Sequence, residues 1–597
     1  MPTAILTGQP VPGSSLEGDL RSLGFDVRPA SDAGETGTLL AAVPANERVA
    51  VVDARFVGHV HALRLGLTDP RFAASAIPGA VSVQPEARRA LTRAVTRESV
   101  AAGNAAAAPE DLVERLGATL EADDVSVYRP DLGTLVAAVP ADPQERNGVR
   151  QAVLAVDDEA VRLRSAVKAR DGFFTTYCIS PYSRYIARWC ARRGLTPNQV
   201  TTASLITALI AAGCAATGTR VGFVAAGLLL MFSFVLDCTD GQLARYSLQY
   251  STLGAWLDAT FDRAKEYAYY AGLALGAARG GDVWALALGA MILQTCRHVV
   301  DFSFNEANHD ATANTSPTAA LSGKLDSVGW TVWVRRMIVL PIGERWAMIA
   351  VLTALTTPRI TFYALLVGCA FAATYTTAGR VLRSLTRKAR RTDRAARALA
   401  DLTDSGPLAE YLTRFAGRLS RVAPAVVALF AGAVVVTSAA LAPYGSWLPV
   451  LGALVYVLLS PAALLRPLKG ALDWLVPPFF RAAEYLTVLA LAFNADVNGA
   501  LPAAFGLVAA VAYHHYDTVY RIRGNAGAPP HWLVRAIGGH EGRTLLVTVL
   551  AALLTAAQFA VALTAVAVAV ALLVLVESIR FWVSSGAPAV HDEGEPA

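Results

Sequence analysis

The stretch LDCTDGQLARYSLQYSTLGAWLDATFDRAKEY, residues 236–267, places four aspartates at the edges of two apolar segments. Asp237 and Asp240 are three residues apart, and Asp258 and Asp262 are four apart, so on helices each pair lies on one face. A carboxylate in the hydrocarbon region costs about 2.5 to 3.5 kcal/mol, so four of them need compensation. If the two faces meet, the carboxylates form an oxygen-rich cluster that suits a hard divalent cation such as Mg²⁺ or Mn²⁺.

The composition of the whole chain indicates a membrane protein. Its 597 residues are 54% hydrophobic and only 17% charged, and its mean hydropathy of +0.42 is above that of ordinary soluble proteins. The net charge of +5 is small for this length and is spread over many loops, which argues against nucleic acid as a partner. The six cysteines show neither a CxxC pair nor a zinc spacing, so we interpret them as small core residues.

Apolar stretches that approach the length of a bilayer span recur from about residue 195. We expect an α-helical polytopic membrane protein with about twelve transmembrane helices in two six-helix units. The first six spans are expected at 197–217, 221–243, 253–277, 282–304, 340–357 and 359–382. The second six are expected at 421–441, 446–465, 472–495, 499–519, 543–557 and 559–582, the last two being alternatively one long broken segment.

The charge of the loops predicts the orientation in the membrane. Basic residues collect in alternate loops, as in RSLTRKARRTDRAAR after the sixth span, whereas loops such as APYGS and NADVNG carry almost none. Because positive charge marks the cytoplasmic side, both halves are expected to begin and end in the cytoplasm. We therefore expect a multi-pass protein of the plasma membrane whose aspartates face the cytoplasm.

Residues 1–165 predict a soluble α/β domain. Short β-like runs such as TAILTG and RVAVVDAR alternate with helical stretches such as PEARRALTRAV. The first residues lack the charged and apolar regions of a signal peptide, so this domain is expected in the cytoplasm. The aromatic and arginine-rich segment 166–195 then favours an interfacial juxtamembrane helix.

Written as a pattern, the residues from Asp237 to Asp262 read D-x2-D-G-x2-A-R-x8-G-x3-D-x3-D. This pattern resembles the signature of the CDP-alcohol phosphatidyltransferase family, and the likeness extends from about Asp171 to Leu385, including RRGLTPNQVTTASL before the first span. The resemblance implies a catalytic six-helix unit at 196–386. It would transfer a phosphoalcohol group, of phosphatidyl or inositol-phosphate type, from a CDP-alcohol to an acceptor alcohol and release CMP, in phospholipid or polyol-phosphate biosynthesis.

The resemblance also implies roles for single residues. Two Mg²⁺ or Mn²⁺ ions would be bound by Asp237, Asp240, Asp258 and Asp262, and Asp262 would also be the catalytic base for the acceptor hydroxyl. The nucleotide site would consist of Asp240, Gly241, Ala244, Arg245, Gly254 and Asp258. Candidates for the acceptor side are Arg192, Arg193, His298 and Asp301. For these four, anchoring to lipid headgroups or an interfacial hydrogen-bonded cap is the alternative.

The order of a soluble domain, a DGFF…SRY segment and a six-span unit is similar to fused enzymes that pair an inositol-phosphate cytidylyltransferase with a di-inositol-phosphate phosphate synthase. The N-terminal domain departs from that pattern, because its opening loop AILTGQPVPGSSLEG contains no Arg or Lys. Asp53, after a predicted strand, is a weak echo of a metal-binding aspartate. We expect a degenerate nucleotidyltransferase-like or Rossmann-like domain; the alternative is a bifunctional enzyme that makes its own CDP-alcohol.

The second half of the chain contains a likeness to the first. WLVPPFFRAAEY (474–485) is identical to WLDATFDRAKEY (256–267) at seven of twelve positions. The four aspartates, in order, are matched by Leu458, Pro461, Val476 and Phe480. We expect 415–585 to be a second, non-catalytic six-helix unit, after a basic cytoplasmic linker at 387–414 and before a disordered tail at 586–597. The two units would form an internal pseudo-dimer; a homodimer is the alternative.

Two further classes of protein fit parts of the sequence. Twelve spans in two similar halves also describe secondary transporters. Transporters draw polar residues near the midplane from both halves, whereas these acids lie at the cytoplasmic ends of two neighbouring spans in one half. A non-enzymatic scaffold with a vestigial catalytic unit is the third alternative, and the intact aspartate pattern argues against it.

Overall fold

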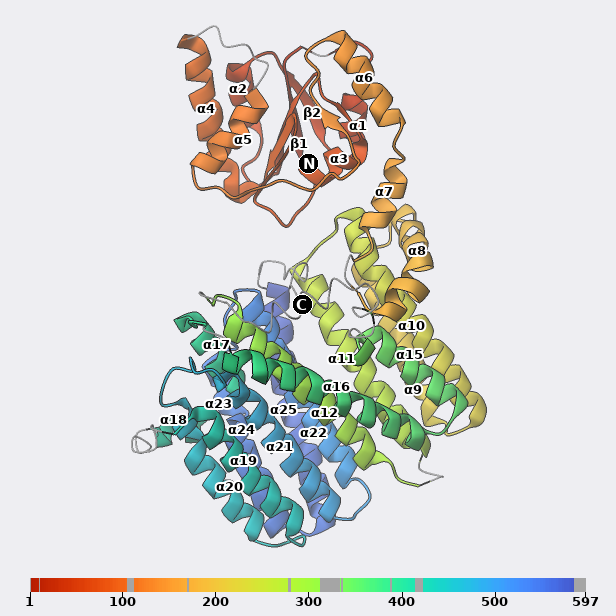
Figure 1. Cartoon of the computed structure of the whole chain (residues 1–597), viewed down its shortest axis with the longest axis vertical. Coiled ribbons are helices and arrows are strands. Elements are labelled where there is room, and N and C mark those ends of the chain that lie inside the picture. Colours follow the sequence, from red (N-terminus) through yellow and green to blue (C-terminus); the bar gives the residue numbers. More distant parts are fainter. Residues whose placement is uncertain are drawn as a thin grey trace. The chain divides into compact units, whose positions relative to one another are not determined.

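The computed structural model describes residues 2–9, 11–104, 112–168, 171–277, 281–311, 333, 337–386, 389–413 and 422–584. The chain forms two compact units (Figure 1). The first unit consists of Met1–Ala169, Tyr182–Pro197 and Thr239–Ser251, and the second of Arg170–Pro181, Asn198–Cys238 and Thr252–Ala597. The predicted tail at 586–597 lies outside the described residues.

The first unit contains a six-stranded mixed sheet in the order β2-β1-β3-β6-β5-β7. β1 (Thr3–Thr7) runs parallel to β2 (Asp26–Ala30) and β3 (Val49–Asp53). The antiparallel strand β6 (Ala80–Val83) then joins β3 to β5 (Ala74–Ile77), and β7 (Val127–Tyr128) lies parallel to β5 at the edge. A two-stranded sheet pairs β4 (Val57–Gly58) with β8 (Ala137–Ala138).

Helices cover both faces of this sheet, which explains why β1 and β3 are continuous apolar runs (Figure 1). Ile5 and Val51 pack on one side against α2 (Ala33–Ala42), α4 (Arg88–Asn104) and α5 (Leu112–Ala122). Their strand neighbours Leu6 and Val52 point to the other side, against α1 (Leu16–Ser22) and α3 (Val60–Leu67). The predicted N-terminal α/β region is confirmed. It is followed by α6 (Pro143–Leu154), α7 (Asp158–Ser165) and α8 (Ser180–Arg192).

A helix lies in each of the twelve segments that the sequence predicts as spans. The first six are α9 (Pro197–Ala216), α10 (Arg220–Ser247), α11 (Thr252–Gly276), α12 (Trp284–Asn308), α15 (Ile342–Leu355) and α16 (Pro358–Thr386). The second six are α19 (Pro424–Leu441), α20 (Leu448–Leu459), α21 (Val476–Asn494), α22 (Ala500–Arg523), α24 (Gly539–Leu553) and α25 (Ala556–Ser584). The linker before the second set forms α17 (Asp393–Thr403) and α18 (Pro407–Leu412).

Six helices in the described part of the chain are long and apolar enough to cross a bilayer. Large apolar side chains point outward from them, such as Leu228, Val367 and Val561 with 67%, 71% and 71% of their surface exposed. Such exposure is costly in water and favourable in lipid. The chain is therefore a multi-pass membrane protein, whereas the count of twelve crossings stays a prediction.

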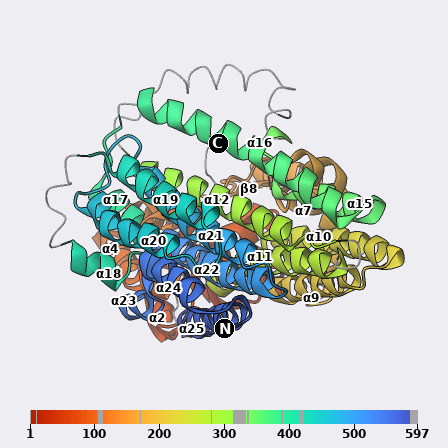
Figure 2. The same cartoon turned by 90° about the horizontal axis from the view of Figure 1, so that it is seen from below.

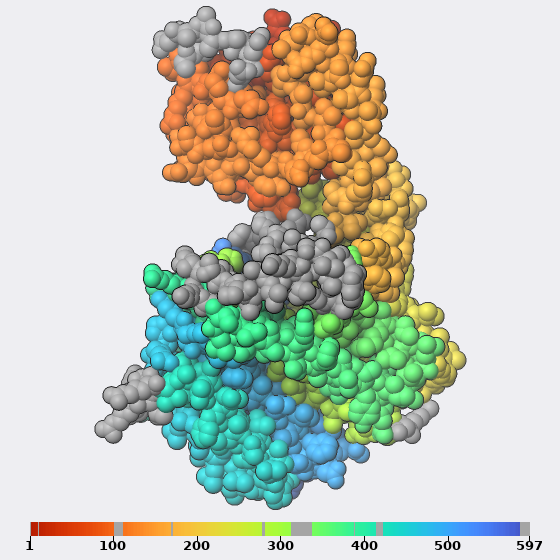
Figure 3. Space-filling model, in the orientation of Figure 1, coloured from red at the N-terminus to blue at the C-terminus, as the bar shows by residue number. Residues whose placement is uncertain are grey.

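The two sets of six helices pack directly against each other. α12 contacts α16 of its own set and also α21 and α22 of the other set, and α11 contacts α22 and α25 (Figure 2). Phe304 of α12 and Val381 of α16 belong to the same apolar cluster as Trp474 and Phe480. In the space-filling view the green surface of α16 continues onto the cyan helices of the second set (Figure 3).

Candidate metal and nucleotide site

Three of the four aspartates come together on α10 and α11. Asp237, Asp240 and Asp258 each offer one carboxylate oxygen, and these three oxygens lie within 4.8 Å of one another. Among the described residues, no other group of His, Cys, Asp and Glu side chains meets this criterion for a metal site. Asp240 is buried, Asp237 is half-buried and Asp258 is exposed, so the group is reached from the side of Asp258. Three converging hard oxygen donors fit a divalent cation such as Mg²⁺ or Mn²⁺.

A buried lysine connects the fourth aspartate to this group. Lys265 Nζ lies 2.8 Å from Asp262 Oδ1 and also contacts Asp237 Oδ1. It donates a further hydrogen bond to Ser204 Oγ on α9, at 3.2 Å. The lysine is 0% exposed, so the two carboxylates share a positive charge that compensates their burial. We did not predict Lys265 from the sequence, where its signal is a lysine one turn after Asp262 and just before the apolar run AYYAGLALG.

A second buried charge cluster fixes the orientation of α11. Glu266, which is 2% exposed, accepts an ion pair from Arg263 at 3.0 Å and another from Arg345 of α15 at 3.2 Å. Tyr270 donates to the same carboxylate at 2.7 Å. A buried charge network of this kind holds its members in one arrangement. It therefore determines which way α11 presents Asp258 and Asp262.

Gly241 lies beside the side chain of Arg245. A Cβ atom at Gly241 would lie nearest the Arg245 guanidinium, at an ordinary contact distance of 3.5 Å. Arg245 itself donates from Nε to the carbonyl oxygen of Ala166, 2.6 Å away at the end of α7. The nucleotide-binding roles of Gly241, Ala244, Arg245 and Gly254 stay predictions.

Of the candidate acceptor residues, Arg192 and Arg193 contact side chains of the protein itself. Arg192 Nη2 lies 3.9 Å from Glu159 Oε1, and Arg193 lies over the ring of Trp189 at 5.3 Å. Both follow the exposed aromatic side chains of α8, among them Tyr182, Tyr185 and Trp189, whose spacing puts them on one face as expected for an interfacial helix.

His298 and Asp301 contribute to helix packing. The His298 ring nitrogens lie 2.7 Å from Gln294 Nε2 and 2.7 Å from the hydroxyl of Tyr516 on α22. Asp301 forms an ion pair with Arg380 of α16. These contacts support the hydrogen-bonded alternative for both residues, and an acceptor-binding role stays a prediction.

The N-terminal domain has its own cavity of about 270 Å³. It lies beside the loop after β1, and its lining includes Ser14, Ser15, Asp19, Arg146 and Arg150. Both arginines come from α6, and Arg150 donates to the carbonyl oxygen of Gly13 at 3.2 Å. Basic groups missing from the opening loop are thus supplied by a helix more than a hundred residues later, which sequence reasoning missed. Asp53 is not available as a simple metal ligand, because Arg55 binds both of its oxygens, at 2.9 and 3.1 Å.

A buried histidine in this domain predicts a dependence of its stability on pH. His61 is 4% exposed, and burial, together with Arg162, Arg64 and His59, lowers its pKa to about 3. The unfolded chain binds this proton near its ordinary pKa of about 6.5, so stability should fall as the pH drops from about 6.5 towards 3, by at most about 1.4 kcal/mol per pH unit. Pulse proteolysis in urea at pH 7 and pH 4.5 measures this loss, which His61→Phe should reduce.

The control for this experiment is His309→Phe, because His309 is exposed and lies outside the domain. It should leave the pH dependence of the N-terminal domain unchanged. If His61→Phe has the same pH dependence as this control, the neutral buried histidine does not limit acid stability.

Comparison with known proteins places these residues in a family. Residues 194–376, which include the whole of α10 and α11, match the family model described as CDP-alcohol phosphatidyltransferase. Residues 194–376 are a CDP-alcohol phosphatidyltransferase domain. Residues 393–597 match a family of unknown function, DUF5941. Members of the phosphatidyltransferase family use divalent metal ions, and the three-aspartate group of this phosphatidyltransferase domain fits that requirement.

Several relatives are named as synthases or transferases, and two of the three described next have an inositol phosphate in their name. The chain is 27% identical over 203 residues to the "Bifunctional IPC transferase and DIPP synthase" of Aquifex aeolicus, covering 33% of this chain and 45% of that protein. It is 36% identical over 121 residues to the "Phosphatidylinositol phosphate synthase" of Mycolicibacterium smegmatis, covering 20% and 53%. It is 34% identical over 103 residues to the "Archaetidylinositol phosphate synthase" of Pyrococcus horikoshii, covering 17% and 53%. The chain spans about half the length of each of these relatives.

Proposed function

We propose that the chain is a membrane CDP-alcohol phosphotransferase. It transfers a phosphoalcohol group from a CDP-alcohol to an acceptor alcohol and releases CMP. The observation that carries the proposal is the convergence of Asp237, Asp240 and Asp258 within a phosphatidyltransferase domain, with their oxygens at most 4.8 Å apart. A single aspartate pair would fit many helix ends, but three converging acids in this domain favour catalysis.

The aspartates would bind the metal, and Lys265 would compensate their negative charge. Asp237, Asp240 and Asp258 are the proposed ligands, with Asp262 as a further ligand, for two Mg²⁺ or Mn²⁺ ions. When bound, the metal supplies positive charge that neutralises the pyrophosphate and the departing CMP. Lys265, at 2.8 Å from Asp262, places a positive charge beside that carboxylate.

Asp262 is the proposed general base. Its carboxylate takes the proton of the acceptor hydroxyl while the hydroxyl oxygen forms a bond to the phosphorus of the CDP-alcohol. The bond between that phosphorus and the oxygen of CMP breaks, and CMP leaves with the electron pair. Gly241, Ala244 and Gly254 are proposed to leave space for the nucleotide, with Arg245 near its phosphates.

The donor and acceptor are proposed from the names of the relatives. Two of the three relatives are named as synthases of a lipid inositol phosphate, which supports an inositol phosphate or a related polyol phosphate as acceptor and a CDP-linked lipid or inositol as donor. The N-terminal domain is proposed to bind a phosphate-bearing ligand in its cavity through Arg146 and Arg150. The pairing of Asp53 with Arg55 supports a degenerate nucleotidyltransferase over a bifunctional enzyme.

The direct test is CMP release by the purified chain in detergent. A panel of CDP-alcohols and polyol or polyol-phosphate acceptors is incubated with Mn²⁺ or Mg²⁺, and we expect CMP only when metal, donor and acceptor are all present. Uptake of the same acceptors into vesicles that contain the protein, without CMP release, would favour a transporter instead. Protease protection of the N-terminal domain in sealed vesicles tests the proposed cytoplasmic side.

A further inference from the structure

A buried cluster of two arginines and one glutamate occurs twice in the chain, once in each set of six helices. The members are Arg263, Glu266 and Arg345 in the first set, and Arg481, Glu484 and Arg543 in the second. In the second cluster the ion pairs with the glutamate measure 3.0 and 2.5 Å. In both sets the third helix supplies one arginine and the glutamate three residues later, and the fifth helix supplies the other arginine. The spacing, the helices and the ion pairs thus agree with the sequence repeat at 256–267 and 474–485.

The repeat includes the chain before the first helix of each set. Glu541, at the start of the fifth helix of the second set, accepts from the backbone nitrogens of Gly406 and Ala409 at 2.9 and 3.1 Å. Glu344, at the start of the fifth helix of the first set, accepts from the backbone nitrogen of Phe174 at 3.2 Å. In each set, an acid in the first turn of the fifth helix, one residue before the arginine in the first set and two before it in the second, holds the backbone of the segment that leads into the helices.

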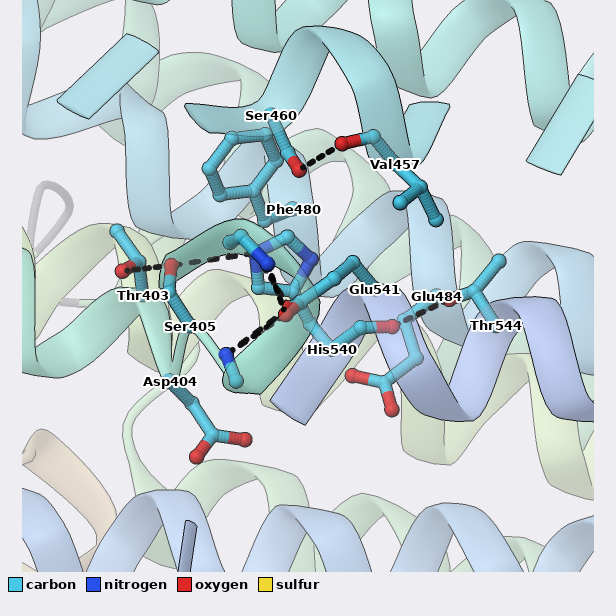
Figure 4. Close-up of polar contacts among 12 residues, drawn as sticks. Thr403, Asp404, Ser405, Val457, Ser460, Phe480, Glu484, His540, Glu541 and Thr544 are labelled. Carbon is cyan, nitrogen blue, oxygen red and sulfur yellow. Dashed lines mark hydrogen bonds and ion pairs between the residues drawn. The ribbon is translucent and has the colours of Figure 1, made fainter. Parts of the chain in front are cut away.

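The second set has lost the metal ligands and has filled their space. Pro461 stands in the place of Asp240, and α20 ends at Leu459, two residues before it, because a proline has no N–H for the helix. Phe480, in the place of Asp262, is fully buried and stacks on His540 with ring centroids 4.3 Å apart (Figure 4). Aromatic stacking therefore replaces the carboxylates of the first set.

Loop 403–409, which comprises the last residue of α17, the connection to α18 and the first turn of α18, closes this space from the linker side. Asp404 has a left-handed backbone with φ of 55° and is 4% exposed. Its carboxylate lies 2.7 Å from Arg543, 3.1 Å from Arg481 and 3.0 Å from His514. Its carbonyl oxygen accepts from the backbone nitrogen of His540 at 3.0 Å. A charged side chain of the linker is thus bound among the helices of the second set, on a segment that contacts His540 (Figure 4).

The contacts between the two sets also have the form of a two-fold pair. The third helices of the two sets are α11 and α21, and the fourth helices are α12 and α22. The third helix of each set contacts the fourth helix of the other set, and the two fourth helices contact each other. Exchange of the two sets maps these contacts onto themselves, as in an isologous dimer interface. The interface includes the hydrogen bond between His298 and Tyr516 and the ring contact between Tyr267 and Phe505.

We propose that residues 393–584 are a second, catalytically silent copy of the six-helix fold, closed by its own loop 403–409, and that this copy is the built-in partner of α11 and α12. The lack of catalysis by this copy rests on the proposed function, whereas the duplication and the closure rest on the contacts between the described residues. The copy covers the faces of α11 and α12 that contact α21, α22 and α25. It therefore makes the internal pair the structural unit of the protein.

The closure is tested in the full chain with Asp404→Asn and the matched control Asp401→Asn, whose side chain is exposed on α17 three residues earlier. A cysteine is introduced at Ser460, which is 0% exposed, and its reaction with a maleimide is followed by peptide mass spectrometry. We expect labelling at least about tenfold faster with Asp404→Asn than with Asp401→Asn, because two buried arginines then share the single carboxylate of Glu484. The melting temperature should fall by roughly 5 °C or more with Asp404→Asn only.

A second variant covers the case in which Asp404→Asn does not fold. In Gly406→Ala the new Cβ would meet the carbonyl oxygen of Gly538 at 2.4 Å, which displaces the loop without removing a charge. It should also expose the cysteine at Ser460. Equal labelling in the control and in both folded loop variants would overturn the closure.

The silence of the copy is tested by counting Mn²⁺ with electron paramagnetic resonance. We expect the double variant Asp237→Asn/Asp258→Asn to lose all saturable Mn²⁺ binding. Saturable Mn²⁺ that remains at 393–584 would overturn the silence. A wild-type chain that binds no Mn²⁺ would instead contradict the proposed function, and the labelling result would still decide the closure.

Discussion

Asp262→Asn should lower CMP release by about 10³-fold or more while the protein remains folded and inserted. The amide keeps the size and the hydrogen-bonding position of the carboxylate but cannot take the proton of the acceptor hydroxyl, and a positioned general base contributes about 10² to 10⁴-fold. The measurement is the rate of CMP release at saturating Mn²⁺, together with the melting temperature. A loss of rate at an unchanged melting temperature is the expected combination.

The matched control for Asp262→Asn is Asp282→Asn. Asp282 is exposed and caps the start of α12 through the backbone nitrogen of Trp284, away from the four aspartates in sequence. This control should keep wild-type turnover. If Asp262→Asn also keeps wild-type turnover, Asp262 is not the base, even if the three other aspartates bind metal.

Lys265→Met should make the stability of the protein strongly dependent on divalent metal. Methionine fills a similar volume but leaves Asp237 and Asp262 without the positive charge that they share. Removing one partner from a buried ion pair costs about 3 to 5 kcal/mol. In EDTA the melting temperature of the variant should therefore be well below that of the wild type. Added Mn²⁺ should raise the melting temperature of the variant more than it raises that of the wild type.

The control for the lysine is Lys469→Met, because Lys469 is 41% exposed and pairs with Asp393, which is 79% exposed. Such surface pairs contribute about 0 to 1 kcal/mol, so the melting temperature should hardly change. If Lys265→Met melts like this control in EDTA, the two carboxylates do not depend on the lysine for their burial.

The sequence was most informative where a local pattern determines the structure. Apolar runs predicted a helix in each of twelve segments, and the spacing of Asp237, Asp240 and Asp258 predicted their convergence, because helical periodicity fixes which residues share a face. Alternation of short strands with helices likewise predicted the α/β region. Several helix ends differed by a few residues, and the span expected at 446–465 is an α-helix only to Leu459, two residues before Pro461.

The sequence was least informative where contacts join distant segments. The place of Lys265 depends on how α9, α10 and α11 pack, and no local pattern contains that information. The same holds for Asp404, which lies in a linker predicted as merely basic and yet reaches Arg481 and Arg543. Arg146 and Arg150 reach the first loop of the sheet only because α6 folds back onto it.

Pro461 is an obstacle to regaining a metal site in the second half of the chain. An acid at this position would first require loss of the proline, which by itself restores no ligand. An aspartate at Val476 or Phe480 would then be buried without a partner, at a cost of about 2.5 to 3.5 kcal/mol apiece until the set was complete, whereas Leu458 is 57% exposed. No single substitution along that route is favourable, so this half is free to diverge towards new tasks but has no gradual way back to its former chemistry.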